Sequence, residues 1–367
     1  MIGASRVITV VMALSPALTA CGAGRSVGHS RGAAAVSGRP AGRSPRAATV
    51  PGRSHPGTRP VHSAATPSVP QAVAARSPQT LPPPRRLAVF MASPAGGQGI
   101  GRPAGRRVGG VAAVYETTLV PPAGSRPAGI AWMDTRRLVA RLYSGSKSPG
   151  GGPFRYTAPI RASSARHLVA AFNGGFMPDA AGGGYYTEGR LIKPLRAGAA
   201  SLVIHADGSA TVGAWGRDVR MTRDVVAVRQ NLVPLVADGR PARRAAGADW
   251  RVWGSTCGAR SCAASVPGIE HQWRSALGVT SDGALIYVQG AELAPRQLAE
   301  LLVRAGTIRG MELDINPDWP VFATYDPNHA NGLAEPANGR LLTATVRGPG
   351  TFFESWWARD FITMSTR

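Results

Sequence analysis

Residues 273–316 read WRSALGVTSDGALIYVQGAELAPRQLAELLVRAGTIRGMELDIN, and this stretch decides the expected fold. Two apolar segments, 277–280 and 284–289, flank Ser-Asp-Gly, a turn sequence that supplies positive φ and predicts a β-hairpin. Residues 295–305 open on a proline, carry one apolar stripe at helical spacing and precede a glycine, which predicts a helix. A further strand is expected over 311–316. The stretch is therefore a hairpin followed by a strand–helix–strand unit.

The chain before this stretch adds more strands. A buried strand is expected over 168–172, and a second hairpin over 200–214, where Asp207-Gly208 forms the turn. Strand composition also marks residues 111–119, 128–133 and 137–143. Hairpins together with one strand–helix–strand unit predict an α+β fold, a single mixed-sheet domain.

The strand at 311–316 separates apolar from polar side chains. Alternation places Met311, Leu313 and Ile315 on one face and Glu312, Asp314 and Asn316 on the other. Acids are costly to bury without partners, so this face predicts an acid/base pair or a site for Ca²⁺ or Mg²⁺. The alternative is a solvated strand face. Asp318 and Trp319 follow in an irregular loop, where functional residues are common.

Two other segments are candidate ligand sites. Asn173-Gly174-Gly175 follows a strand, and paired glycines allow the backbone to approach a ligand closely. Arg274 enters a strand and would place a guanidinium at a phosphate or carboxylate. The alternatives are a tight turn at 173–175 and a surface ion pair at Arg274.

The positive charge is unevenly distributed along the chain. Of 367 residues, 42 are Lys or Arg and 20 are Asp or Glu. Residues 1–107 hold 14 of the basic residues and no acidic one, so residues 108–367 have a net charge of only +8. Residues 21–107 are rich in Pro, Gly, Ser and Ala, which predicts a disordered tether before a domain at 108–367. The composition does not favour nucleic-acid binding.

The N-terminus has the pattern of a secretory signal. Arg6, a short apolar run and Leu-Thr-Ala-Cys ending at Cys21 resemble a bacterial lipoprotein signal over residues 1–20. This predicts an extracytoplasmic protein held to the cell membrane by a lipid on Cys21. An ordinary secretory signal with an incidental cysteine is the alternative.

The remaining cysteines and the tether fit an extracytoplasmic location. Cys257 and Cys262 lie in a Gly/Ser-rich loop and are expected to form a small disulfide ring, with two free thiols as the alternative. The arginines of the tether are candidates for contact with lipid headgroups or an anionic cell-wall polymer. The alternative is that they reflect biased composition.

Six short motifs in order resemble the phosphodiester glycosidase family over residues 165–345. The motifs are AFNGGF at 171–176, TEGRLIKP at 187–194, LVADGR at 235–240, WRSALGV at 273–279, DGALIYVQG at 282–290 and MELD at 311–314. The family includes the lysosomal uncovering enzyme, which removes N-acetylglucosamine from a sugar phosphodiester. After the aspartate the family usually has a glycine-rich loop, whereas this chain has Ile-Asn-Pro-Asp-Trp at 315–319.

The resemblance implies an envelope hydrolase that cleaves a sugar phosphodiester or a related linkage of a glycan such as an exopolysaccharide. Asp314 and Glu312 would be catalytic, and would also be the ligands of a cation. The expected substrate-binding residues are Asn173, Gly174, Gly175, Glu188, Arg274, Asn316, Asp318 and Trp319. One alternative is a non-catalytic glycan- or cell-wall-binding lipoprotein, with Trp273 and Trp319 as stacking platforms. The other is a surface protein that binds a cation only for stability.

Overall fold

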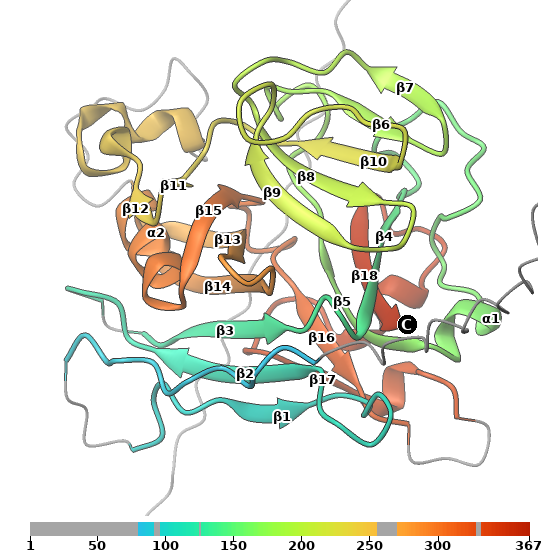
Figure 1. Ribbon diagram of the computed structural model, residues 1–367, viewed down its shortest axis with the longest axis horizontal. Coiled ribbons are helices and arrows are strands. Elements are labelled where there is room, and N and C mark those ends of the chain that lie inside the picture. The colour runs from blue at the N-terminus through green and yellow to red at the C-terminus, as the bar shows by residue number, and fades with distance from the viewer. Residues whose placement is uncertain (1–79, 92–95, 125, 255–269, 328–331) are drawn as a thin grey trace, which may run out of the picture. The chain divides into compact units, whose positions relative to one another are not determined.

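The computed structural model describes residues 80–91, 96–124, 126–254, 270–327 and 332–367 (Figure 1). The expected signal peptide at 1–20, Cys21 and the Cys257 and Cys262 pair lie outside these residues, as does most of the expected tether. In the described part of the chain, no helix has the length and apolar character needed to cross a membrane.

The described strands form three sheets, and every strand pairing within them is antiparallel. Sheet I contains, in spatial order, β1 (Arg102–Ala104), β2 (Val114–Leu119), β3 (Ala128–Met133), β14 (Leu285–Leu293), β13 (Gln272–Thr280), β15 (Thr307–Glu312), β11 (Val236–Ala237) and β12 (Arg240–Pro241). Sheet II contains β7 (Arg190–Lys193), β6 (Tyr185–Thr187), β10 (Val225–Gln230), β8 (Ala200–His205) and β9 (Ala210–Ala214). Sheet III contains β17 (Gly339–Leu341), β16 (Phe322–Tyr325), β5 (Leu168–Asn173), β18 (Phe361–Thr366) and β4 (Leu138–Tyr143).

Helices are short and few in the described residues. The α-helices are α1 (Ala162–Ala165) and α2 (Pro295–Arg304), and the 3₁₀ helices are η1 (Arg243–Ala246), η2 (Ala248–Trp253), η3 (Pro336–Asn338) and η4 (Pro349–Phe353). The expected α+β class is therefore wrong: the described chain is mainly β, with three antiparallel sheets. The physical reason is that the three sheets bury apolar faces against one another, so a helix is needed only over the other face of sheet I, where α2 packs.

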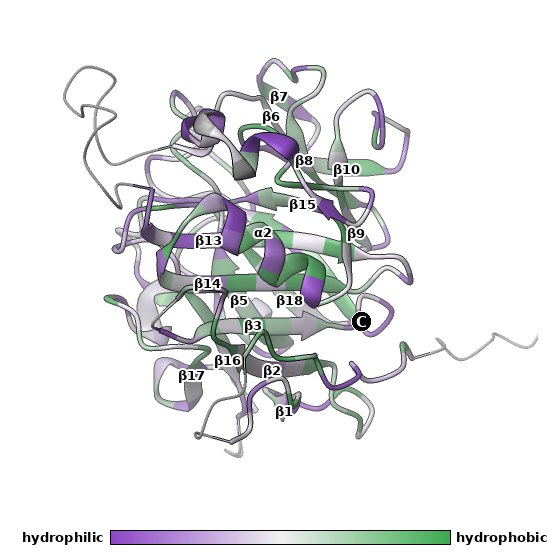
Figure 2. Ribbon diagram, turned by 90° about the vertical axis from the view of Figure 1, so that its left-hand side faces the viewer, coloured by the Kyte–Doolittle hydropathy of each residue, from purple (hydrophilic) through white to green (hydrophobic). Residues whose placement is uncertain are grey.

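The hairpin and the helix predicted from 273–316 are confirmed. β13 and β14 pair across a turn whose Gly283 has a φ of +93°, and β8 pairs with β9 across Gly208, whose φ is +80°. Leu298 and Leu302 of α2 are fully buried, and Gly306 follows the helix with a φ of +89°. α2 packs on β13, β14 and β15, as its position over sheet I in Figure 2 shows. β14 and β15 both pair with β13, which therefore separates them.

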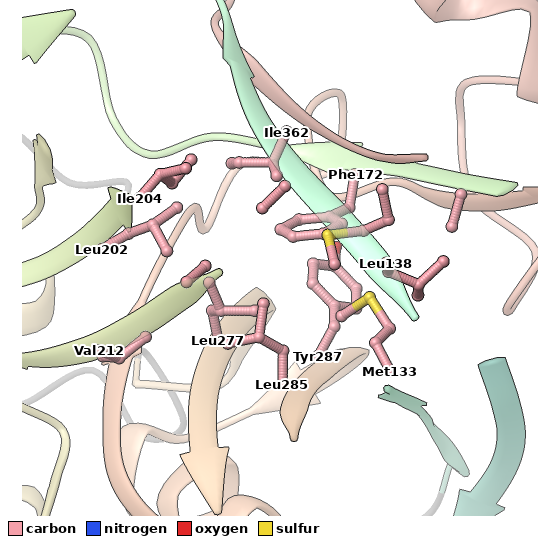
Figure 3. Packing of buried hydrophobic residues seen from close by; sticks show 14 of the residues in the cluster. Met133, Leu138, Phe172, Leu202, Ile204, Val212, Leu277, Leu285, Tyr287 and Ile362 are labelled. Atoms are coloured by element: carbon pink, nitrogen blue, oxygen red, sulfur yellow. The ribbon is translucent and has the colours of Figure 1, made fainter. Parts of the chain in front are cut away.

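Side chains from all three sheets meet in one core (Figure 3). Leu277 and Tyr287 come from sheet I, Leu202 from sheet II, and Phe172 and Ile362 from sheet III, and each is at most 1% exposed. The Phe172 and Tyr287 rings pack with centroids 5.2 Å apart. Because the apolar area is shared, no sheet can leave the core without exposing the other two.

The folded part begins before residue 108, where the end of the tether was expected. β1 pairs with β2, and Leu81 is 1% exposed in an apolar cluster. The backbone N–H of Leu81 also donates to the Asp134 carboxylate, at 3.1 Å. Residues 80–91 and 96–107 therefore contribute to the fold.

Leu277 tests the shared core. Leu277→Ala is expected to lower the free energy of unfolding by about 2–5 kcal/mol, because it leaves a cavity between sheets. Leu191, which is 58% exposed, is the matched control, and Leu191→Ala is expected to cost less than about 1 kcal/mol. Chemical denaturation followed by circular dichroism measures both, and equal losses would contradict a core shared by the sheets.

Candidate active site

Five strand ends from the three sheets meet where the predicted polar residues lie. β5 ends at Asn173, β10 at Gln230 and β15 at Glu312, while β13 and β18 begin there. Antiparallel pairing explains this arrangement, because the start of one strand lies beside the end of its neighbour. Phe361 at the start of β18 pairs with Asn173, and Ala276 in the middle of β13 pairs with Glu312.

The predicted alternation over 311–316 is present, although the regular strand ends at Glu312. Met311 and Leu313 enter the shared core, whereas Glu312 and Asp314 belong to the buried polar residues. Ser275 continues the pairing past the strand end, since its N–H donates to the Asp314 carbonyl at 2.9 Å and its carbonyl accepts from Leu313 N–H at 2.8 Å. The chain then turns away, because the Asp314 carboxylate binds the next two backbone N–H groups.

Glu312 forms an ion pair with Arg274, and both side chains are fully buried. Arg274 Nη1 lies 2.5 Å from Glu312 Oε1. The same guanidinium donates to the carbonyls of Leu293 at 2.7 Å, Glu270 at 3.0 Å and Trp253 at 3.3 Å. The donors of Arg274 are therefore used within the protein. Glu312 Oε2 is buried and has no hydrogen-bond partner among the described residues.

Asp314 is 1% exposed and uses both carboxylate oxygens. Oδ2 binds the guanidinium of Arg359, and Oδ1 accepts the backbone N–H of Ile315 at 2.8 Å and of Asn316 at 3.1 Å. Arg359 also donates to the Gly175 carbonyl at 3.0 Å and lies over the Trp319 ring, 5.0 Å from its centroid. Asp314 thus links the loop after β15 to the segment before β18.

Both acids have raised pKa values. Burial raises the pKa of Glu312 to about 7, against the opposing effect of Arg274, and the charge of Asp314 adds to the rise. Burial also raises the pKa of Asp314 to about 6, against the effects of Arg359 and of two backbone hydrogen bonds. Both carboxyl groups therefore have pKa values close to neutral pH, which is the range that general acid/base catalysis requires.

Asn173 joins sheets I and III through hydrogen bonds to other buried groups. Its Oδ1 accepts from the Tyr287 hydroxyl at 2.6 Å and from Val321 N–H at 3.2 Å. Its Nδ2 donates to Ser275 Oγ at 3.0 Å, and Ser275 Oγ in turn accepts Asp314 N–H at 3.2 Å. Asn173 and Asp314 are therefore linked through Ser275, and the Arg274–Glu312 pair lies next to them in the chain; a catalytic role for these residues stays a prediction.

Packing against protein side chains explains the two glycines after Asn173. A Cβ on Gly174 would lie 2.5 Å from Asp360 Oδ2, and one on Gly175 would lie 2.4 Å from Asn231 Oδ1. These contacts are far shorter than van der Waals distances, so neither position admits a side chain. The close approach that the glycines allow is made here to Asp360 and Asn231, and their role in lining a substrate stays a prediction.

A third buried ion pair, between Arg229 and Asp360, was not expected from the sequence. Arg229 Nε lies 2.7 Å from Asp360 Oδ2, with side chains 2% and 0% exposed, and Ser148 Oγ donates to Asp360 Oδ1 at 2.9 Å. Asn231 Nδ2 donates to the Glu312 carbonyl at 2.9 Å. The pattern that could have identified these residues is the one seen at 312–314, a run of polar residues next to an apolar strand. Arg-Gln-Asn at 229–231 lies at the end of β10, and Arg-Asp at 359–360 directly precedes β18.

The other predicted residues lie at the edge of the cluster or away from it. Asn316 is exposed, and its Oδ1 accepts the N–H of Asp318 at 3.0 Å in the loop that carries the half-buried Trp319. Glu188 is separate: its carboxylate accepts the N–H groups of Arg155 at 2.8 Å and Tyr156 at 2.9 Å. No group of three metal-ligating side chains occurs among the described residues, so the divalent cation stays a prediction.

Comparison with known proteins gives distant fold matches only. No family model matches the chain, and no curated protein does. The zebrafish N-acetylglucosamine-1-phosphodiester alpha-N-acetylglucosaminidase catalytic domain, auto-inhibited by its pro-peptide, aligns over 73% of this chain and 88% of its own, with 16% identity and a TM-score of 0.43. A hypothetical protein from Synechocystis aligns over 72% and 64%, with 12% identity and a TM-score of 0.40. A putative exported protein from Burkholderia pseudomallei aligns over 72% and 57%, with 13% identity and a TM-score of 0.25.

The raised pKa of Glu312 predicts a pH-dependent stability. The pKa is about 7 in the folded chain against an ordinary 4.5, so the folded state loses stability as the pH rises through this interval. Glu312→Gln cannot ionise, and the variant is therefore expected to gain about 3 kcal/mol relative to wild type between pH 4.5 and pH 8. Denaturant titrations over this range measure the difference.

The diagnostic quantity is how the difference in the free energy of unfolding between wild type and Glu312→Gln changes with pH. Its absolute value is not diagnostic, because the variant also removes the carboxylate partner of Arg274, which lowers stability at every pH. Glu300→Gln, which removes a surface partner of Arg296 on α2, is the matched control. A difference between wild type and Glu312→Gln that does not change with pH would rule out the raised pKa.

Proposed function

We propose that this protein is an extracytoplasmic hydrolase of a glycosidic linkage, with a sugar phosphodiester as its first substrate class. The observation that carries the proposal is the pair Glu312 and Asp314: two buried carboxyl groups with pKa values of about 7 and 6, in one polar cluster with Arg274 and Arg359. The order of motifs that resembles the phosphodiester glycosidase family supports the same reaction.

The two acids suit different roles in glycoside hydrolysis, which uses one protonated and one ionised carboxyl group. Glu312 has the higher pKa and an Oε2 without a partner among the described residues, so it is the general acid. Asp314 has the lower pKa and is held as a carboxylate by Arg359 and two N–H groups, so it is the nucleophile, the base or the stabiliser of an oxocarbenium-like centre.

Arg359 suits the phosphate better than Arg274 does. Arg274 donates to Glu312 and to several backbone carbonyls, whereas Arg359 Nε has no partner among the described residues. Both acids are buried, so turnover requires the chain to expose them. The loop 316–319 is the element that must move, because Asp314 holds its start and Arg359 lies against Trp319.

A glycan-binding protein without catalysis is the second candidate function. Trp356 is 52% exposed, and an exposed aromatic side chain can stack on a sugar ring. The guanidinium of Arg347 lies 5.1 Å from the ring centroid of Trp356 and 5.6 Å from that of the half-buried Trp319, so a sugar would stack on the opposite face of the Trp356 indole. Under this function the buried ion pairs serve stability alone.

Turnover assays separate these candidates. The full chain is incubated with chromogenic sugar phosphodiesters and with the matching simple glycosides, and release of the leaving group is followed. Asp314→Asn and Glu312→Gln are each expected to lower kcat/KM by about 10²–10⁴-fold, the usual contribution of a positioned acid or base. Glu300→Gln is the control and should retain full activity.

Folding of the variants is verified by their melting temperatures, and the wild-type pH profile is measured as well. A pH profile of kcat/KM that falls on either side of a maximum between about pH 6 and pH 7 supports the pair. Full activity in Asp314→Asn contradicts the catalytic assignment, and no turnover on any substrate together with retained glycan binding favours the second function.

We propose that a lipid on Cys21 holds the protein to the outer face of the cell membrane, on the basis of the signal at 1–20. Metabolic labelling with a fatty acid is expected in the wild-type chain and not in Cys21→Ala. Equal labelling of both would contradict the anchor.

A further inference from the structure

A hollow that does not include the acids at 312 and 314 lies between β4, the segment 155–167 and the end of β18. Its volume is about 550 Å³, within the range of pockets that hold small ligands, about 300–1,000 Å³. Its lining consists of Val139, Arg141, Tyr143, Arg155, Tyr156, Thr157, Arg161, Ser163, Ser164, His167, Ser365, Thr366 and Arg367.

The charge of this lining is entirely basic. Arg141, Arg155, Arg161 and Arg367 contribute guanidinium groups, His167 contributes an imidazole, and the lining contains no Asp or Glu. Arg141, Arg155 and Arg161 are exposed, while the Arg367 guanidinium donates to backbone carbonyls. A concave surface with one sign of charge concentrates counter-ions, so the hollow attracts an anion.

The polar groups around the charges are held in place. The guanidinium carbons of Arg141 and Arg155 lie 4.9 Å and 5.3 Å from the centroid of the Tyr156 ring. Tyr156 packs on Tyr143, with ring centroids 5.5 Å apart. Glu188 anchors the backbone of 155–156 through the two hydrogen bonds described above. The arginines are thus positioned by ring contacts and by a fixed backbone.

A neighbouring hollow has a volume of about 370 Å³. The two share Val139, Arg141, Arg155 and Tyr156 in their linings. The second contains Glu188 and His205 and more apolar side chains, so the charge is concentrated in the first. The two hollows on either side of these shared residues are hereafter called the β4 groove, and the anionic groups of a ligand suit the first of them.

We propose that the β4 groove binds an anionic oligosaccharide, with the acidic groups of the sugar against Arg141, Arg155 and Arg161. Guanidinium groups bind carboxylate and phosphate with paired hydrogen bonds, and the Ser and Thr hydroxyls of the lining suit sugar hydroxyls. A nucleic acid fits less well, because the Tyr156 ring is already engaged by two guanidiniums and is not free to stack on a base. The proposal does not depend on the hydrolase activity.

Calorimetric titration of the full chain tests this proposal with matched probes. The probes are trigalacturonate, which carries carboxylates, a phosphorylated maltotriose, and maltotriose itself as the neutral form. Both anionic probes are expected to bind at least about tenfold more tightly than maltotriose, and more weakly as salt is added. Their order shows whether the acidic group is a carboxylate or a phosphate.

Charge-matched variants locate the binding. The triple change Arg141→Gln, Arg155→Gln and Arg161→Gln is expected to weaken binding at least about tenfold, since charge-assisted hydrogen bonds are lost. The control removes the same charge from exposed arginines elsewhere, Arg240→Gln, Arg243→Gln and Arg244→Gln, and should change the affinity less than about threefold. All six residues are exposed, so both variants should fold.

The proposal is overturned if neither anionic probe binds, or if maltotriose binds with the same affinity as the anionic probes. It is also overturned if the two triple variants lose the same affinity for the anionic probes. A fourth contrary outcome is that a single-stranded oligonucleotide binds through the same three arginines more tightly than either anionic sugar does. Asp314→Asn should bind the anionic probes as wild type does. Its turnover therefore tests the hydrolase proposal independently of the groove.

Discussion

Two buried arginine–carboxylate pairs and one asparagine hydrogen bond tie the three sheets to one another. Arg229 of sheet II binds Asp360 next to sheet III, Arg359 beside it binds Asp314 next to sheet I, and Asn231 after sheet II reaches the Glu312 carbonyl of sheet I. Arg274 pairs with Glu312 inside sheet I. Breaking a buried pair by removing one partner typically costs about 3–5 kcal/mol, because the other charge stays buried.

This cluster also constrains what the site can do. Burial raises the pKa values of Glu312 and Asp314 into the range where enzymes use carboxyl groups, but the same burial keeps substrate away from them. Asp314 shows both sides of this conflict. Its ion pair with Arg359 joins sheet I to sheet III, and it is also the candidate nucleophile. A catalytic protein must therefore loosen the Asp314 loop without separating the sheets. The β4 groove carries no such conflict, because its arginines are exposed.

Local patterns predicted the parts of the fold whose causes are local. The hairpins followed from Asp-Gly turns, α2 from its leucine spacing, and the two faces of the chain around Met311 from alternation. The α+β class was wrong because one amphipathic helix says nothing about what covers the other sheet faces. Arg229, Arg359 and Asp360 were missed because polar residues at the ends of strands are common. They form buried ion pairs only with partners that are distant in the sequence, and no local pattern indicates those partners.

The sequence by itself determined the strands, the helix, the glycines at 174–175 and the polar run Glu312–Asp314, since each depends on neighbouring residues and on the periods of strand and helix. Only the tertiary structure decided the partners: which arginine neutralises which acid, which atoms touch the glycines and where the β4 groove opens. The arginine–acid pairs join residues up to 131 positions apart in the chain, as Arg229 and Asp360 are. Contacts at that separation follow from packing three sheets around one core, and no local pattern specifies them.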